Sequence, residues 1–196
     1  MVIERMTELH HIFRQIFSQF PENTIMLFAD SFRERHYKKG DTFLQDGSIS
    51  RNLAFIQKGA MMCYYVKNGK RYIDEFSLDY EFITDYSSFI HQTPSDKTIE
   101  CLEDSTVFSI SYDSLQTLYQ MNSVTFERLG RVMSEQLYCQ WHEKSKSLLM
   151  DDAREKYLKL VENRPGLPQR IPQYLIAEYL GITPESLSRV RSGLVK

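Results

Sequence analysis

The stretch from Tyr37 to Ile110 constrains the fold more than any other part of the chain. Short runs of β-prone residues alternate there with turn sequences, which read KKGD, QDGS, QKG, KNGK and HQTPSD. This texture predicts an antiparallel barrel or sandwich. The clearest hairpin joins Ala60–Val66 to Arg71–Phe76, because Asn68-Gly69 between them supplies the positive φ angles of a tight two-residue turn.

Helical periodicity replaces this pattern on both sides of the stretch. Apolar residues recur at three- and four-residue steps, and Pro21 interrupts the first such run. The sequence ENRPGLPQR, near the end of the chain, indicates a connecting loop. Helices are therefore predicted over residues 4–20, 22–32, 114–119, 123–150 and 152–163.

The predicted helix over residues 123–150 carries one apolar stripe with polar interruptions in its second half. The members of the stripe are Phe126, Leu129, Met133, Leu137, Gln140, Lys144 and Leu148. Such a stripe predicts either a dimer seam or packing of the helix on its own barrel. We favour the seam, formed by Phe126, Leu129, Met133, Leu137 and Gln140, and leave the second interpretation open.

Charge is unevenly distributed along the chain. The formal net charge is only -2. From Ala153 onward, however, eight lysines and arginines face four acidic residues, a net charge of +4, which leaves -6 on residues 1–152. An acidic body is thus joined to a basic tail, and only the tail suits a polyanion such as a nucleic acid.

The tail contains a segment with the pattern of two short helices joined by a tight turn, IPQYLIAEYLGITPESLSRVRSGL (residues 171–194). Pro172 suits the first helical turn, and Gly181 can take the left-handed conformation that caps a helix. Ile182 would fill the space between the two helices. The inward residues of the first helix are Leu175, Ile176, Tyr179 and Leu180.

The second helix of this segment would begin at Pro184 with Thr183 as its N-cap, and Leu187 and Val190 would face inward. The same spacing leaves polar side chains outside, where the edges of DNA bases and phosphates would meet them. They are Thr183, Glu185, Ser186, Ser188, Arg189 and Arg191. Spacing alone fits a plain helical hairpin equally well, and the basic balance of the tail favours DNA binding.

The segment resembles the helix-turn-helix of the Crp/Fnr family of bacterial transcription regulators. The matching positions are Ala177, Gly181, Ile182, Thr183, Glu185, Ser188 and Arg189. Upstream, YKKGDTFLQDGSISRNLAFIQKGAMMCYYVKNGK and ECLEDSTVFSISYDSLQTL resemble the opening and closing strands of the cyclic-nucleotide-binding-type β-roll of that family. The resemblance covers nearly the whole chain.

The resemblance implies an α+β fold. It consists of an N-terminal antiparallel β-roll (jelly-roll-like, a double-stranded β-helix) with flanking helices, a long dimerisation helix and a C-terminal all-α helix-turn-helix. The implied domains are an effector domain (1–121), the dimerisation helix (122–150) and a DNA-binding domain (151–196). Because the chain stops at Lys196, we expect the helix-turn-helix to lack the wing of the family.

The resemblance also implies partners and roles. The implied partners are double-stranded DNA with an inverted-repeat operator and a second copy of the chain. RNA polymerase is a possible third partner in this family. Glu185 and Arg189 would contact base edges, with Ser188 beside them. Without a wing, phosphate contacts would be fewer unless Lys156, Lys159 or Arg170 compensated.

Ligand binding departs from the family pattern. In cyclic-AMP-binding members a Gly-Glu pair contacts the ribose and a following Arg-Ser or Arg-Thr pair binds the cyclic phosphate. Here those positions read Thr84-Asp85 and Ser95-Asp96, and the helix positions that complete the site read Gln140 and Trp141. Two carboxylates repel a phosphate, and Lys97 nearby does not replace a bidentate arginine. We expect no binding of cyclic AMP.

Another effector, or none, is compatible with the sequence. Four aromatic residues near these positions would either line an apolar site or belong to the core; they are Tyr80, Phe82, Tyr86 and Phe89.

Two other function classes stay open. A cupin-like metalloenzyme would need histidines at metal-ligand spacing, but only His36 and His91 fall within the roll. No serine or cysteine has a recognisable neighbouring base, so we expect no enzyme activity, no metal and no cofactor. The other alternative is a ligand-binding or dimeric adaptor without DNA recognition.

The three cysteines, Cys63, Cys101 and Cys139, are odd in number and far apart, which argues against a disulfide framework and indicates buried small side chains. The charged N-terminus resembles neither a signal peptide nor a membrane span, so we expect a soluble cytoplasmic protein.

Overall fold

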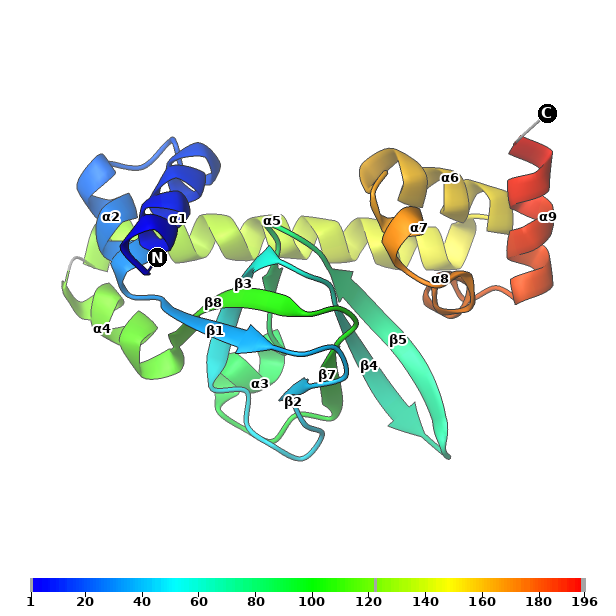
Figure 1. Ribbon diagram of the computed structural model, residues 1–196, viewed down its shortest axis with the longest axis horizontal. Coiled ribbons are helices and arrows are strands. Elements are labelled where there is room, and N and C mark those ends of the chain that lie inside the picture. Colours follow the sequence, from blue (N-terminus) through cyan, green and yellow to red (C-terminus); the bar gives the residue numbers. More distant parts are fainter. Residues whose placement is uncertain (1, 122, 195–196) are drawn as a thin grey trace.

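The computed structural model describes the backbone of residues 2–121 and 123–194. One long helix, α5, runs the length of the molecule, with helices at both of its ends and the strands between them (Figure 1). The helices are α1 (Val2–Ile16), α2 (Glu22–Asp30), α3 (Tyr86–His91), α4 (Tyr112–Met121), α5 (Ser123–Met150), α6 (Ala153–Asn163), α7 (Leu167–Arg170), α8 (Gln173–Leu180) and α9 (Pro184–Leu194). Helices α1, α2 and α4 lie at one end of α5, and α6 to α9 lie at the other.

In the described part of the chain the strands form two four-stranded sheets, in the orders β1-β8-β3-β6 and β2-β7-β4-β5. Neighbouring strands are antiparallel. The strands are β1 (Arg33–Tyr37), β2 (Thr42–Leu44), β3 (Asn52–Lys58), β4 (Met61–Lys67), β5 (Lys70–Ser77), β6 (Phe82–Ile83), β7 (Lys97–Cys101) and β8 (Ser105–Ser111). The predicted antiparallel β-roll is confirmed.

The described residues form three buried apolar clusters. One lies within the roll and includes Ala54, Ile56, Met61, Ile99 and Val107. It also takes up Cys63 and Cys101, as expected, whereas Cys139 on α5 is exposed, so the prediction of three buried cysteines was wrong there. Burial raises the pKa of Cys63 to about 12 and that of Cys101 to about 11, so both thiols stay protonated.

The hairpin between β4 and β5 has the turn that its sequence predicts. Asn68 and Gly69 have φ angles of 53° and 72°. Lys67 pairs with Lys70 across this two-residue loop. Positive φ at both central residues matches the right-handed twist of the two strands, which is why Asn-Gly serves here.

Three elements differ from the sequence expectation. Strand β1 begins at Arg33 rather than Tyr37, because RERHY is a largely exposed edge strand without an apolar pattern. Helices α3 and α7 were not expected. With six and four residues, they are too short for helical periodicity to be recognised.

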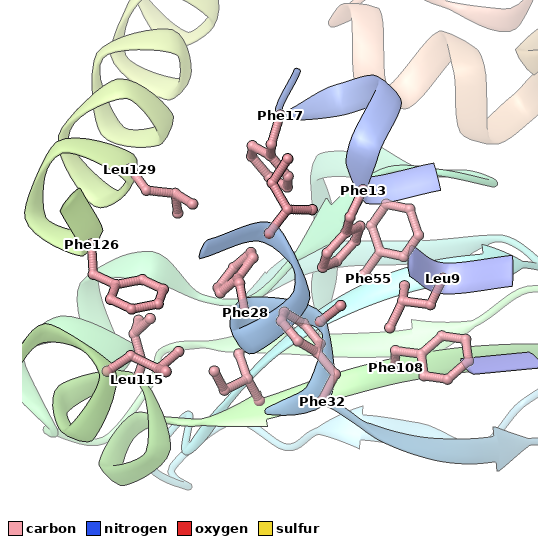
Figure 2. Close-up of a cluster of buried hydrophobic side chains, with 14 of the residues drawn as sticks. Leu9, Phe13, Phe17, Phe28, Phe32, Phe55, Phe108, Leu115, Phe126 and Leu129 are labelled. Carbon is pink, nitrogen blue, oxygen red and sulfur yellow. The ribbon is translucent and has the colours of Figure 1, made fainter. Parts of the chain in front are cut away.

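An aromatic cluster joins α1 and α2 to the roll and to the first turns of α5 (Figure 2). Phe13 of α1 is its centre, with no exposed surface and five phenylalanine rings around it. Phe126 and Leu129 of α5 are each 1% exposed and belong to the same cluster. These two side chains therefore pack inside the chain, and their assignment to a dimer seam has to be corrected. Met133 also packs against the cluster.

A second interface joins the C-terminal helices to the roll. Met62, Ile73 and Phe76 on β4 and β5 share one buried cluster with residues of α6 to α9. Those residues include Tyr157, Leu160, Leu167, Leu175, Ile176, Leu180 and Leu187. Because α8 packs directly on β5, the C-terminal helices are held by the sheet as well as by their connection to α5.

Candidate functional site

Helices α8 and α9 form the predicted helix-turn-helix. Gly181 ends α8 with a φ of 66°, and the amides of Gly181 and Ile182 close the helix on the carbonyls of Glu178 and Ala177. Leu175, Ile176, Leu180 and Leu187 are buried, and Tyr179, Ile182 and Val190 pack against them. The predicted inward residues of this segment are thus confirmed.

Gly181→Ala should lower the free energy of unfolding by about 1 kcal/mol, because a side chain disfavours the left-handed backbone there. No neighbouring atom lies within 4 Å of the added Cβ, so conformation alone decides the effect. Gly193→Ala is the matched control, since Gly193 lies within α9 with open space around it. Urea unfolding should show no loss for the control, and equal losses would contradict a special role of Gly181.

The N-terminal half of α9 presents the predicted polar face. Thr183, Glu185, Ser188 and Arg189 are exposed, while Ser186 and Arg191 are half-buried. Thr183 acts as the cap, because its Oγ1 accepts the Ser186 amide at 3.2 Å. Hydrogen bonds from its own amide and from Thr183 lower the pKa of Glu185, which therefore stays ionised at neutral pH.

A groove of about 390 Å³ runs beside this face, between α6 and α9. Arg154, Ser186 and Arg189 contribute its polar lining. The Arg189 guanidinium donates to Ser186 Oγ at 3.3 Å and has no carboxylate partner among the described residues. The face of α9 thus carries one anionic and several neutral or cationic groups, a set that matches both donors and acceptors of base edges.

Two arginines of the tail point the other way, into the interface with the roll. Arg170 donates to both oxygens of Asp79, to both oxygens of Glu103 and to the Gly59 carbonyl, at 2.7–3.2 Å. Arg164 donates to Glu75 at 2.9 Å and also pairs with Glu81. We call these two arginines and their four carboxylates the arginine clamp.

The clamp corrects one expectation. Arg170 and Lys159 were candidates for extra phosphate contacts. Arg170 is committed to the roll, and Lys159 pairs with Asp151 at 2.5 Å. Part of the positive charge of the tail is therefore neutralised by ion pairs with acidic residues of the body. The positions of these residues in the sequence do not reveal the pairing.

The candidate effector residues are only partly brought together. Asp85 and Ser95 are both 3% exposed, and Ser95 Oγ donates to Asp85 Oδ2 at 2.7 Å. Thr84 instead bonds Ser50 and the Asn52 carbonyl. Asp96 and Gln140 are exposed.

Lys97 completes this part of the roll. Its ammonium lies 3.0 Å from Asp74 Oδ2 and 3.7 Å from Asp85 Oδ1. Asp74 carries no signal in the sequence that marks it for this site; its place on β5, opposite β4, brings it there. We call Asp74, Asp85, Ser95 and Lys97 the roll site.

Comparison with known proteins addresses the fold. Residues 34–122 match the family model of the cyclic nucleotide-binding domain. Among solved structures, the c-di-GMP-responsive global regulator CLP of Xanthomonas campestris is 18% identical, with 89% of this chain and 91% of that chain covered and a TM-score of 0.67. FixK2 of Bradyrhizobium japonicum is 21% identical, with coverages of 83% and 84% and the same TM-score.

The catabolite activator protein of Thermus thermophilus is 18% identical, covers 88% of this chain and 83% of that chain, and has a TM-score of 0.52. The chain has the fold of the Crp/Fnr regulators. No curated protein has a sequence that matches this chain significantly.

Within this Crp/Fnr fold the roll site is tied to α5. Lys144 of α5 bonds the Asp74 carbonyl and lies 3.5 Å from Glu75 Oε2. Trp141, one turn earlier, has the Lys144 ammonium 4.5 Å and the Lys97 ammonium 5.8 Å from its ring centroid. Trp141 therefore does lie at the roll site, whereas Gln140 does not.

Glu75 extends this set of contacts to the helix-turn-helix. Its Oε1 accepts from Arg164 at 2.9 Å and from the Tyr179 hydroxyl of α8 at 3.2 Å. Burial, followed by the charge of Glu75, raises the pKa of Tyr179, so this hydroxyl remains a donor. A continuous series of polar contacts thus connects Asp85, through Lys97, Asp74, Lys144 and Glu75, to Tyr179 on α8.

The four aromatic residues near the roll site do not line a common pocket. Phe82 and Phe89 belong to or pack against the aromatic cluster around Phe13. Tyr80 and Tyr86 are 54% and 41% exposed, and the Tyr86 hydroxyl pairs with Ser134. The core interpretation holds for the two phenylalanines.

Among the described residues, no group of three or more His, Cys, Asp or Glu side chains is arranged to hold a metal ion. Nor does any described helix have the length and apolar character needed to cross a membrane.

Proposed function

We propose that this protein is a dimeric, sequence-specific DNA-binding transcription regulator of the Crp/Fnr type. The observation that carries the proposal is the polar face of α9, presented on a helix-turn-helix whose residues Leu175, Ile176, Leu180 and Leu187 are buried. DNA as the partner also implies a cytoplasmic location.

In this proposal α9 enters the major groove. Arg189 donates to the two acceptors of a guanine, Glu185 accepts from a cytosine amino group, and Ser188 adds a neighbouring contact. Thr183, Ser186 and Arg191 lie at the edges of the same face, where backbone contacts would be made. The groove between α6 and α9 places Arg154 beside these residues.

The dimer is proposed to form along α5, on a face that excludes Phe126 and Leu129. Tyr138, His142, Ser145 and Leu149 recur at steps of four, three and four residues and are exposed. Tyr138 and Leu149 are 71% and 86% exposed, which is unusual for large apolar side chains on a helix of a folded domain. A second copy of the chain, packed along this stripe, would bury them and set two α9 helices about 34 Å apart on the DNA.

Selection from random DNA with the purified full chain tests the proposal. We expect enrichment of an inverted repeat whose half-sites are centred about one helical turn, 10–10.5 base pairs, apart. Enrichment of a single half-site would contradict the dimer but would still support DNA binding by α9. No enrichment would contradict DNA binding and favour the adaptor.

Arg189→Ala should weaken binding to the selected sequence by about 1–3 kcal/mol and relax the preference at one base position. Fluorescence anisotropy with operators changed at each position measures both effects. Arg131→Ala is the control, because Arg131 lies on α5 in an exposed pair with Glu135. A uniform loss across all sequences would make Arg189 a phosphate contact instead.

The roll is proposed not to bind cyclic AMP. The positions that bind the phosphate in cyclic-AMP-binding relatives hold Ser95 and Asp96, and Asp85 nearby is a buried carboxylate whose Oδ1 accepts no hydrogen bond in the described structure. An anion placed there would meet the carboxylates of Asp85 and Asp96 and no arginine. Calorimetry with cyclic AMP should show no binding at micromolar concentrations.

A further inference from the structure

The Lys97 ammonium is surrounded by carboxylates and aromatic rings at the roll site. Two carboxylates approach it, Asp74 at 3.0 Å and Asp85 at 3.7 Å. Two rings cover it, with the centroids of Tyr65 and Trp141 at 5.1 Å and 5.8 Å. The carboxylate side chains are only 10% and 4% exposed, so solvent screens this interaction little.

These groups select for a cation. Carboxylates and the faces of aromatic rings both present negative potential, and together they form the kind of cage that binds alkylammonium groups. Ser95 does not change this, because its hydroxyl donates to Asp85 Oδ2 and holds that carboxylate in place. Burial by itself lowers the pKa of Lys97, but the charge of Asp74 and the hydrogen bonds that the ammonium donates to Asp74 and Tyr65 outweigh it and raise that pKa.

The cage coincides with the effector position of the fold. Asp85 and Ser95 stand where cyclic-AMP-binding relatives place their ribose and phosphate contacts, and Trp141 belongs to the helix that completes the site. We propose that the effector position of this protein is an alkylammonium site that its own Lys97 fills, so that a tethered cation stands in place of a diffusible effector. The proposal concerns the roll alone and does not depend on DNA binding by α9.

Occupation of the site by Lys97 accounts for the ion pairs that link the roll to α5. Lys97 neutralises Asp74, which also lies 3.9 Å from Lys144 of α5, and Lys144 leads to Glu75 and the arginine clamp. The contact between roll and α5 that a bound molecule would supply is thus made permanently within the chain. Because the ammonium is attached to β7, its effective concentration exceeds that of any free amine, so the intact protein should not exchange it.

Chemical rescue tests the proposal. Lys97→Ala removes three methylene groups and the ammonium, which is the outline of n-propylammonium. This variant should melt at a lower temperature than the wild type, and millimolar n-propylammonium should raise its Tm. Calorimetry should detect one n-propylammonium per chain in the variant and none in the wild type.

n-Propanol is the matched neutral probe, and sodium chloride at equal ionic strength is the salt control. Neither should stabilise Lys97→Ala. A variant that binds n-propanol as well as n-propylammonium, or a wild type that binds n-propylammonium equally well, would overturn the proposal.

A second comparison keeps the test valid if Lys97→Ala fails to fold. Lys97→Met fills the volume without the charge and leaves Asp85 buried beside no cation. Asp85→Asn should lower the Tm of the wild type, whose Lys97 loses a partner, and raise the Tm of Lys97→Met, which loses an uncompensated charge. Changes of the same sign in both backgrounds would contradict an ammonium site.

Discussion

Phe13→Ala is expected to lower the free energy of unfolding by about 3–5 kcal/mol, the largest effect of any single substitution considered for this fold. The Phe13 ring has no exposed surface. Five phenylalanine rings surround it, from α2, β3, β6 and the segments that follow α1 and α2, with centroids 5.1–6.0 Å away. Rings held by separate parts of the fold cannot all move inward, so the cavity should persist and add its cost to the lost burial.

Leu27→Ala on α2 is the control for Phe13→Ala. Leu27 is 43% exposed and lies next to the buried Phe28 on the same helix. Its truncation should cost well under about 1 kcal/mol, because little area leaves water when the protein folds. Urea unfolding measures both variants. A loss below about 1.5 kcal/mol for Phe13→Ala would mean that α1 is not part of the folded core.

Arg170→Ala is expected to lower the free energy of unfolding by about 2–3 kcal/mol, because it leaves Asp79 and Glu103 without their cation in a partly buried interface. The side chain of Arg170 is 27% exposed, so solvent recovers only part of the loss. The substitution should also loosen the docking of α7 and α8 on the roll. Amide hydrogen exchange in these helices and in β5 should then accelerate more than exchange around Phe13.

Arg131→Ala again provides the control, here for an ion pair in water. Both partners, Arg131 and Glu135, are more than half exposed, and exposed pairs four residues apart on a helix are worth about 0.3–0.5 kcal/mol. If Arg170→Ala were as mild as Arg131→Ala, or if exchange accelerated evenly over the molecule, the arginine clamp would not hold the C-terminal helices.

The parts of the fold that the sequence predicts are those governed by local rules. Asn68-Gly69 marks its hairpin because only certain residues adopt positive φ cheaply. Gly181, Thr183 and Pro184 mark the helix-turn-helix because a cap and a first helical turn each demand particular side chains. Both assignments required no knowledge of the rest of the chain.

The parts that the sequence does not predict depend on which surfaces meet. A helical stripe shows that Phe126 and Leu129 are buried together, but not whether a second chain or the same chain covers them. Arg170 appears in a basic tail, yet its partners lie 67 and 91 residues away in the chain. Likewise Lys97 is recognisable as a basic residue near Ser95 and Asp96, and only the pairing of β7 and β5 with β4 brings it beside Asp74.

We predict that α9 binds DNA while Lys97 permanently occupies the roll site. The most direct test is a titration of the selected operator with wild-type protein, shown by mass spectrometry to carry no small molecule. We predict full, saturable binding to the operator that added cyclic AMP leaves unchanged. Binding that appeared only after a nucleotide was added, or no preference for the operator over random DNA, would contradict it.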